Sequence, residues 1–283
     1  MRKTIFFVIV CIFIATQLYA AQSTIKIAEG SACMGDDKSR KQTETAAIGD
    51  AKRNAIESVQ TYITSATEVK DFELQKDIVS AYANATVTVI EEMEKKWYKD
   101  QAMGDCYKVK IKTEVLPDEK TMTKAKDTAL NDPTLPLNVK VWSDKESYRA
   151  GEKIKIYLKG NKPFFAIVIY RNAANNNLQL LPNPYRNDNY FQGGVIYEIP
   201  SGTDKFELEV NPPFGKESIM LYASGSELGD LNLKQEGSVY VVKTKSQDIG
   251  IKTRGIKIKD VSPGKVQQPV DFSEGALVIE TKK

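Results

Sequence analysis

The side chains that could do chemistry in this chain do not include imidazole, because none of its 283 residues is histidine. A serine or cysteine nucleophile that depends on a histidine base is therefore excluded, and so is any metal site with a histidine ligand. Catalysis or metal binding would have to rest on carboxylates, hydroxyls, thiols or lysines.

Three short patterns resemble chemical motifs, but their sequence context points to structure instead. Glu207 and Glu209 are two residues apart in a strand-like run, so they share a solvated face, unlike a glycosidase acid pair. The run from Ser262 to Lys265 has Ser-x-x-Lys spacing, but it lies in a predicted loop. Residues 187–189 (Asn-Asp-Asn) hold one carboxylate, which suits a turn better than a calcium site. We therefore predict no catalytic residue, no cofactor and no metal site.

One predicted loop carries side chains that are typical of binding surfaces. Tyr185, Arg186, Tyr190 and Phe191 lie close together there, and aromatic residues and arginine are enriched at protein interfaces. The competing interpretation is that tyrosines beside prolines clamp the loop onto a domain core. Exposure of Tyr185 and Tyr190 would favour a binding loop, and their burial would favour a clamp.

The first 20 residues have the pattern of a cleavable secretory signal peptide. Arg2 and Lys3 precede an apolar run from Ile5 to Ile14, and Ala20 supplies a small residue for cleavage. The apolar residue before Cys11 argues against lipidation. An uncleaved membrane anchor is the alternative, although the apolar run is shorter than the ~20 residues of a span. We expect a periplasmic or secreted protein with no membrane span after cleavage.

Cleavage would leave two cysteines, Cys33 and Cys106, in a compartment that favours disulfide bonds. Cys33 lies just past the first predicted strand, and Cys106 begins the last predicted strand of the first half. Antiparallel pairing of these strands would bring the two thiols together. We predict a disulfide that stabilises the fold by about 4 kcal/mol on a chain-entropy model. Two free thiols are the alternative.

Length and charge limit the classes of protein to which the chain can belong. A chain of 283 residues, 41% of them hydrophobic, is long enough for two domains with real cores. The formal net charge of +3 falls to +1 when the two charges of Arg2 and Lys3 are removed. That balance, with both signs interspersed, argues against a nucleic-acid partner.

The first half of the mature chain predicts a small α+β layer. Residues 24–28 alternate as a short strand, and apolar residues recur at helical spacing over 43–62 and again over 71–83. Residues 85–98 are rich in β-forming side chains, and 106–115 alternate strictly, which predicts one buried and one wet face. The order strand, helix, helix, strand, strand indicates two helices on one face of an antiparallel sheet.

Four short runs of this half occur in a recognisable order: 27–32 (IAEGSA), 51–56 (AKRNAI), 64–69 (TSATEV) and 107–111 (YKVKI). With them, residues 23–117 resemble the N-terminal domain of flagellar assembly protein T and related small surface lipoproteins. The resemblance implies an envelope interaction module rather than an enzyme. The chain lacks the lipid-bearing cysteine of the lipoprotein relatives, so outer-membrane anchoring does not carry over.

The second half is rich in short strands. The apolar run 164–170 predicts a strand buried on both faces, 172–177 a hairpin loop, and 178–181 the returning strand. That strand must end before Pro182, because proline lacks the N–H that a ladder needs. Other strands are expected at 139–142, 154–158, 195–199, 206–210, 219–222 and 239–242. Their near-regular spacing indicates an antiparallel β-sandwich.

We therefore expect a two-domain α+β protein with four segments. They are a signal peptide (1–20), an α+β interaction domain (21–116), a linker (117–136) and a β-sandwich domain (137–283). The linker is charged and ends in prolines, which favours an extended form, with a helix packed on the first domain as the alternative. The tail from about residue 245 is expected to be irregular, although 254–258 and 276–280 could add final strands.

Five spaced runs of the second half also occur in a recognisable order: 148–154 (YRAGEKI), 163–170 (PFFAIVIY), 181–185 (LPNPY), 197–200 (YEIP) and 212–215 (PPFG). With them, residues 138–225 resemble the bacterial domain of unknown function 4384. That family has no established activity. The resemblance therefore implies a β fold and an envelope or secreted setting, and it contributes no catalytic residues.

Together these patterns predict an exported envelope protein that acts as a non-catalytic binding or assembly module. Its expected partners are proteins of a surface or secretion assembly. A carbohydrate- or peptidoglycan-binding periplasmic protein is the first alternative, and a hydrolase without histidine is the second.

Overall fold

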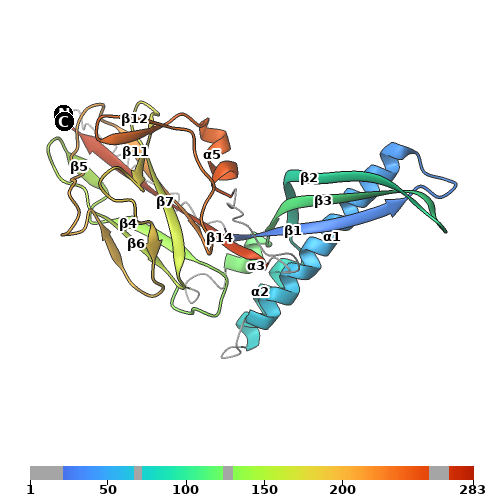
Figure 1. The fold of residues 1–283 in the computed structure, drawn as a ribbon. Coiled ribbons are helices and arrows are strands. Elements are labelled where there is room, and N and C mark those ends of the chain that lie inside the picture. The colour runs from blue at the N-terminus through green and yellow to red at the C-terminus, as the bar shows by residue number, and fades with distance from the viewer. Residues whose placement is uncertain (1–21, 67–71, 124–129, 255–267) are drawn as a thin grey trace, which may run out of the picture.

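The computed structural model of the chain describes residues 22–66, 72–123, 130–254 and 268–283 (Figure 1). The predicted signal peptide and the run from Ser262 to Lys265 lie outside these ranges, as does nearly all of the predicted strand 254–258. Each helix in the described ranges is too short or too polar to cross a membrane. The described elements form an α+β fold dominated by antiparallel strands, as the sequence predicts.

The first lobe has the predicted order of strand, two helices and two strands, and its helices lie along one face of the sheet (Figure 1). Its strands pair in the order β1-β3-β2, all antiparallel. Helix α1 approaches β1 so closely at Gly30 that any β-carbon there would collide with the backbone of Ala47 and Ala51. The elements are β1 (Gln22–Cys33), α1 (Arg40–Ala66), α2 (Phe72–Ala83), β2 (Thr86–Asp100) and β3 (Gly104–Leu116).

The second lobe is a sandwich of two sheets. A three-stranded sheet, β10-β6-β4, packs on β8, β7, β11 and β14 of the larger sheet, and Leu158 and Val168 both belong to the core between them. Helix α3 (Glu119–Thr123) precedes this lobe and packs on the first one, where Met122 joins the core that contains Tyr82 of α2. The elements of the second lobe are β4 (Val139–Ser143), β5 (Ser147–Arg149), β6 (Ile156–Gly160), β7 (Phe164–Arg171), β8 (Asn177–Leu181), β9 (Tyr190–Phe191), β10 (Tyr197–Ile199), β11 (Lys216–Ser224), β12 (Leu233–Glu236), β13 (Val239–Val242), α5 (Ser246–Thr253) and β14 (Val270–Lys282).

Strand β7 is buried on both faces, as its uninterrupted apolar sequence predicts. Phe164 and Val168 face the sandwich core, whereas Ile167 and Ile169 face a second core that includes Ile249 of α5. The hairpin from β7 to β8 is present, and β8 ends at its predicted residue, immediately before the proline. The predicted strand 206–210 is instead irregular and makes a single isolated bridge to the residues before β6.

The C-terminal strand corrects the prediction of an irregular tail. Within the described residues, α5 and the 13-residue strand β14 follow residue 245, and β14 runs through the middle of the large sheet (Figure 1). It pairs along β11 on one side and with the first residues of β1 on the other, so one sheet crosses both lobes. The prolines and the glycine just before residue 270 are typical of a loop, so the local sequence predicts one. The strand forms because it pairs with β1 and β11, which lie far away in the sequence.

Candidate functional site

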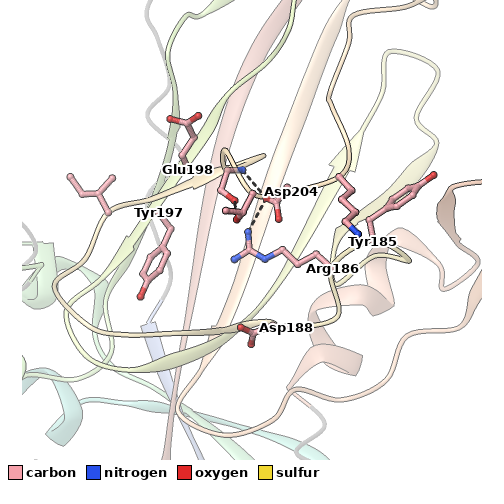
Figure 2. A pocket seen from close by; sticks show the side chains of 10 residues that line it. Tyr185, Arg186, Asp188, Tyr197, Glu198 and Asp204 are labelled. Carbon is pink, nitrogen blue, oxygen red and sulfur yellow. Dashed lines mark hydrogen bonds and ion pairs between the residues drawn. The ribbon is translucent and has the colours of Figure 1, made fainter.

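A pocket of about 480 Å³ opens at one edge of the sandwich, between the loop after β8 and the segment that begins with β10 (Figure 2). The loop contributes one wall, and the segment 196–205 contributes the other. The lining residues are Tyr185, Arg186, Asp188, Ile196, Tyr197, Glu198, Ser201, Thr203, Asp204 and Lys205.

A buried asparagine shapes the loop wall of the pocket. The side-chain oxygen of Asn183 accepts the backbone N–H groups of Tyr185 at 2.8 Å and Arg186 at 2.9 Å. Its side-chain amide donates to the carbonyl of Leu180 at 2.7 Å. Asparagine favours such turns because its side chain hydrogen-bonds to the backbone two residues on. The turn therefore directs Tyr185 and Arg186 away from the strand and toward the pocket.

An ion pair holds the two walls together. Arg186 Nη1 lies 3.1 Å from Asp204 Oδ2, and the two side chains are 18% and 8% exposed. The same Asp204 oxygen accepts the backbone N–H of Ser201 at 2.7 Å. The Arg186 guanidinium also lies 5.5 Å from the ring centroid of Phe191. A charge pair that is this well hydrogen-bonded and packed keeps its geometry, so the pocket is preformed.

The structure separates the four residues of the predicted binding loop. Tyr185 is 50% exposed and Tyr190 is 43% exposed, which meets the condition set for a binding loop. Tyr185 lines the pocket with Arg186. Tyr190 is not among the lining residues, and its ring packs on that of Phe165 with the ring centroids 5.0 Å apart. Phe191 is 1% exposed and belongs to the sandwich core, so its place on a binding surface is corrected.

Most polar side chains of the pocket are already engaged within the protein. Glu198 pairs with Lys155 at 2.6 Å, and the Tyr197 hydroxyl accepts the backbone N–H of Gln192 at 2.9 Å. The other polar groups of the second wall, Ser201 and Thr203, hydrogen-bond to each other at 3.1 Å. Among the described residues, no lining hydroxyl bonds to a side chain that could take its proton, as an activated nucleophile requires. The arrangement offers contacts for a ligand.

Two lining charges have no ion-pair partner among the described residues. Within the described ranges, Asp188 accepts a hydrogen bond from the backbone N–H of Tyr190, at 3.1 Å, and Lys205 extends from an exposed position. The described parts of the chain hold no cluster of three or more carboxylates or thiols that could bind a metal ion. Ligand charges of either sign would therefore find a partner at the rim of the pocket.

The disulfide prediction is confirmed. Cys33 and Cys106 are bonded, and they face each other at the end of the antiparallel ladder between β1 and β3. Their Cα atoms are 3.9 Å apart, which the register of the ladder imposes. The bond therefore closes the end of the β1–β3 ladder, and the C-terminal end of β1 points away from the second lobe (Figure 1).

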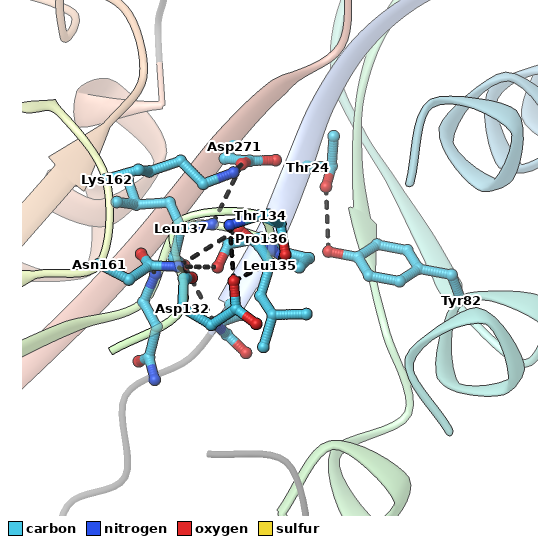
Figure 3. A network of polar contacts seen from close by, with 12 residues as sticks. Thr24, Tyr82, Asp132, Thr134, Leu135, Pro136, Leu137, Asn161, Lys162 and Asp271 are labelled. Atoms are coloured by element: carbon cyan, nitrogen blue, oxygen red, sulfur yellow. Dashed lines mark hydrogen bonds and ion pairs between the residues drawn. The ribbon is translucent and has the colours of Figure 1, made fainter. Parts of the chain in front are cut away.

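A second polar cluster joins the two lobes, and no sequence pattern pointed to it (Figure 3). Asp271 of β14 is 4% exposed, and its Oδ2 accepts hydrogen bonds from Lys162 Nζ at 2.8 Å and from the Leu137 N–H at 3.0 Å. The side-chain amide of Gln22 in β1 donates to the carbonyl of Leu137 at 3.0 Å. The segment between the lobes is thus tied to both of the strands that cross the junction.

Two further residues extend this junction. The Asn161 side-chain amide donates to the carbonyl of Asp132 at 2.8 Å, and the Tyr82 hydroxyl shares a hydrogen bond of 3.0 Å with Thr24 of β1. Burial, together with the nearby charge of Asp271, raises the pKa of Tyr82 above its usual range. Its hydroxyl therefore stays neutral, and α2 is fixed to β1 by a hydrogen bond rather than a charge.

The other face of the junction corrects the prediction of a wet face on β3. Lys112 and Glu114 point to that face but are 4% and 6% exposed. Arg254, at the end of α5, pairs with Glu114 and lies 2.8 Å from Glu274 of β14. Ser23 of β1 donates to Glu114 at 2.6 Å. The second lobe therefore covers the polar side of β3 where the lobes meet.

The comparisons with known proteins bear on the second lobe. Residues 147–227 match the family model described as "Domain of unknown function (DUF4384)", and the pocket lies wholly within them. The match covers less than half of the chain. Neither the curated proteins nor the solved structures include a match. The resemblance of residues 23–117 to the N-terminal domain of flagellar assembly protein T is not shown by these comparisons and stays a prediction.

Proposed function

We propose that this protein is an exported cell-envelope protein that acts as a non-catalytic binding module, with the pocket between residues 185 and 205 as its binding site. Its partners would be proteins of a surface or secretion assembly. The observation that carries the proposal is the ion pair between Arg186 and Asp204, which holds the pocket open while leaving Tyr185 and Ile196 half or more exposed. A preformed site with exposed apolar groups loses little conformational entropy on binding.

Export is supported by the leader pattern and by the Cys33–Cys106 bond, since structural disulfides belong to oxidising compartments. Fractionation of the native cell, with mass analysis of the mature chain, tests it. A mature protein that begins at residue 21 in the periplasm or the medium is expected. Full-length protein in the cytoplasm would sink this part of the proposal.

The binding site can be tested by site-specific photo-crosslinking in the native cell. A crosslinker at Thr203, on the pocket wall, should capture a defined partner, and Tyr185→Ala should remove that product. Tyr98, a 38% exposed tyrosine of the other lobe, supplies the matched control, since Tyr98→Ala should leave the product intact. An unchanged product in the Tyr185→Ala protein would place the partner elsewhere.

A glycan ligand is the second candidate, and one observation favours it. The rings of Tyr185 and Tyr197 line the same pocket as the charged side chains of Asp188 and Lys205, and sugars use aromatic faces together with polar groups. A glycan microarray, with Tyr185→Ala beside the wild type, tests it. Signal that depends on Tyr185 would support this candidate, and no signal above background would reject it.

A further inference from the structure

Strand β10 forms both a wall of the pocket and the end of a sheet. It is the outermost strand of the order β10-β6-β4, and Ile196, Tyr197 and Glu198 are lining residues. In the described part of the chain, nothing pairs with the outer side of β10. Beyond the turn at 200–205, the same edge continues, because the N–H of Ile154 donates to the carbonyl of Leu208 at 2.8 Å. The pocket therefore interrupts an open edge, which presents unpaired backbone groups.

The rim beside this edge is apolar and rigid. Val195 and Ile196, directly before β10, are 45% and 58% exposed. The loop that carries them is fixed, because the N–H of Gly194 donates to the carbonyl of Gly160 at 2.8 Å. Gly194 has φ +77°, a left-handed conformation that other residues rarely adopt. Exposed aliphatic side chains held in place are typical of surfaces that contact proteins.

The long edge strand β2 is protected in a way that β10 is not. Strand β2 ends the large sheet, and its ladder is broken by irregularities between Val89 and Glu91 and between Glu92 and Glu94. Lysines also crowd its later half. Bulges and lysines are common devices against strand addition. Glu198 is the sole charged residue of β10, and it is already paired within the protein.

The pocket favours a polypeptide over a sugar for a related reason. Sugar recognition needs several uncommitted hydrogen-bonding side chains, whereas Arg186, Glu198 and Ser201 are all engaged within the protein. A strand would instead use the open backbone edge for hydrogen bonds and the pocket for a side chain. Asp188 and Lys205, which have no ion-pair partner in the part of the chain that the structure describes, would complement a basic and an acidic residue beside that side chain.

We propose that the partner presents an extended segment, which adds as a strand to the outer edge of β10 and places an apolar side chain in the pocket against Tyr185 and Ile196. This inference rests on the proposed function, and it names the class of ligand for the same site. The segment would carry charged residues of both signs on either side of the apolar one.

The test uses the mature full chain as bait for a displayed library of random twelve-residue peptides. Selected peptides are synthesised, and their affinity is measured for the wild type, Tyr185→Ala and Tyr98→Ala proteins. Each backbone amide of the best peptide is then N-methylated in turn. We expect Tyr185→Ala to weaken binding at least about tenfold, as for an interface anchor, and Tyr98→Ala to leave it unchanged. Methylation should weaken binding at every second position, because a strand turns alternate N–H groups to its neighbour.

The outcomes separate this inference from the function on which it rests. Peptides that depend on Tyr185 but show no alternation, or that bind as helices by circular dichroism, would overturn strand addition and leave the binding module standing. Glycan binding that depends on Tyr185, with no selected peptide, would overturn the class of partner. If neither ligand binds and no crosslink forms at Thr203, both proposals fail. Thermal unfolding of each variant shows that a lost signal is not a folding defect.

Discussion

The pocket and the junction between the lobes each contain a partly or fully buried ion pair, but the two ion pairs serve different purposes. In the pocket, Arg186 and Asp204 are 18 residues apart and hold two loops so that other side chains stay exposed. At the junction, Lys162 and Asp271 are 109 residues apart, and their ion pair fixes the start of β14, which pairs with β1 of the first lobe, so that the surroundings stay buried. The first pair maintains a surface, and the second maintains the fold.

This difference locates function and stability in separate places. Removal of an exposed pocket side chain such as Tyr185, which the Arg186–Asp204 pair helps to position, should affect binding with little effect on folding. Removal of a junction residue should affect folding first, because it leaves a buried partner without its charge. Substitutions in the two regions can therefore confirm the separation or break it.

The largest effect is expected from Asp271→Ala at the junction. The change leaves the Lys162 ammonium and the Leu137 N–H without their acceptor in a buried setting. We expect the free energy of unfolding to fall by about 3 to 5 kcal/mol, the range for breaking a buried ion pair. Urea denaturation followed by circular dichroism measures it.

An exposed pair provides the control for this prediction. Lys153 and Glu207 lie 2.6 Å apart with side chains 61% and 63% exposed. Lys153→Ala should change the free energy of unfolding by about 1 kcal/mol or less, since solvent screens such pairs. Equal losses in the two variants would show that the junction is not a special point of stability.

The sequence was sufficient for elements whose pattern is local. Periodic apolar residues located α1 and α2, an unbroken apolar run located β7, and a proline located the end of β8. The order of the first strands was enough to pair Cys33 with Cys106. Each of these features depends on neighbours within a few turns of chain or on one simple antiparallel ladder.

The remainder depends on residues that meet only in the folded chain. Strand β14 lies at the centre of the large sheet because it pairs with β1 on one side and β11 on the other. The residues just before it have the sequence pattern of a loop. Glu114 is buried because Arg254 covers it from 140 residues away. The second wall of the pocket could not be predicted from the sequence, because the side chains of the segment 196–205 form no recognisable motif. They line a pocket only because the fold places them opposite the loop at 185–188.

The disulfide allows a test of the first lobe apart from the junction. Replacing both Cys33 and Cys106 with serine frees a loop whose ends are 73 residues apart. We expect the free energy of unfolding to fall by up to about 4 kcal/mol, because the unfolded chain regains conformational entropy. Denaturation of the oxidised wild type and the double variant gives the difference. Peptide binding at the pocket should stay unchanged under native conditions, and a lost affinity would show that the lobes are coupled.

A smaller effect on stability is expected from Tyr185→Ala. Its ring is 50% exposed and stacks on Phe206 at 6.3 Å, so the change removes one aromatic contact and little buried surface. We expect a loss of about 1 kcal/mol or less in the free energy of unfolding, together with the loss of the pocket ligand. A loss as large as that of Asp271→Ala would mean that the exposed tyrosine is structural, and the clamp interpretation of the loop would then hold.

The smallest effect on stability is expected at Glu274, on the face of the junction where Arg254 lies. Here the test is the direction in which the free energy of unfolding changes with pH. Burial raises the pKa of Glu274 above its ordinary 4.5, and the neighbouring Glu114 adds to this although Arg254 opposes it. A raised carboxyl pKa means that the native state holds the proton more tightly than the unfolded state. That contribution to stability is present at low pH and is lost as pH rises above 4.5. Wild type should therefore lose stability relative to Glu274→Gln between pH 4 and pH 7.

Urea denaturation of both proteins across this range measures the gap between them. Glu280→Gln, an exposed position on the same strand, controls for the substitution itself. A gap that widens with pH in favour of Glu274→Gln is expected. A gap that narrows or reverses would mean that the Arg254 contact outweighs burial, and that this side of the junction gains from its charges as the Lys162 side does. Ion pairs would then stabilise the fold on both faces of the junction, whereas the ion pair of the pocket positions exposed side chains.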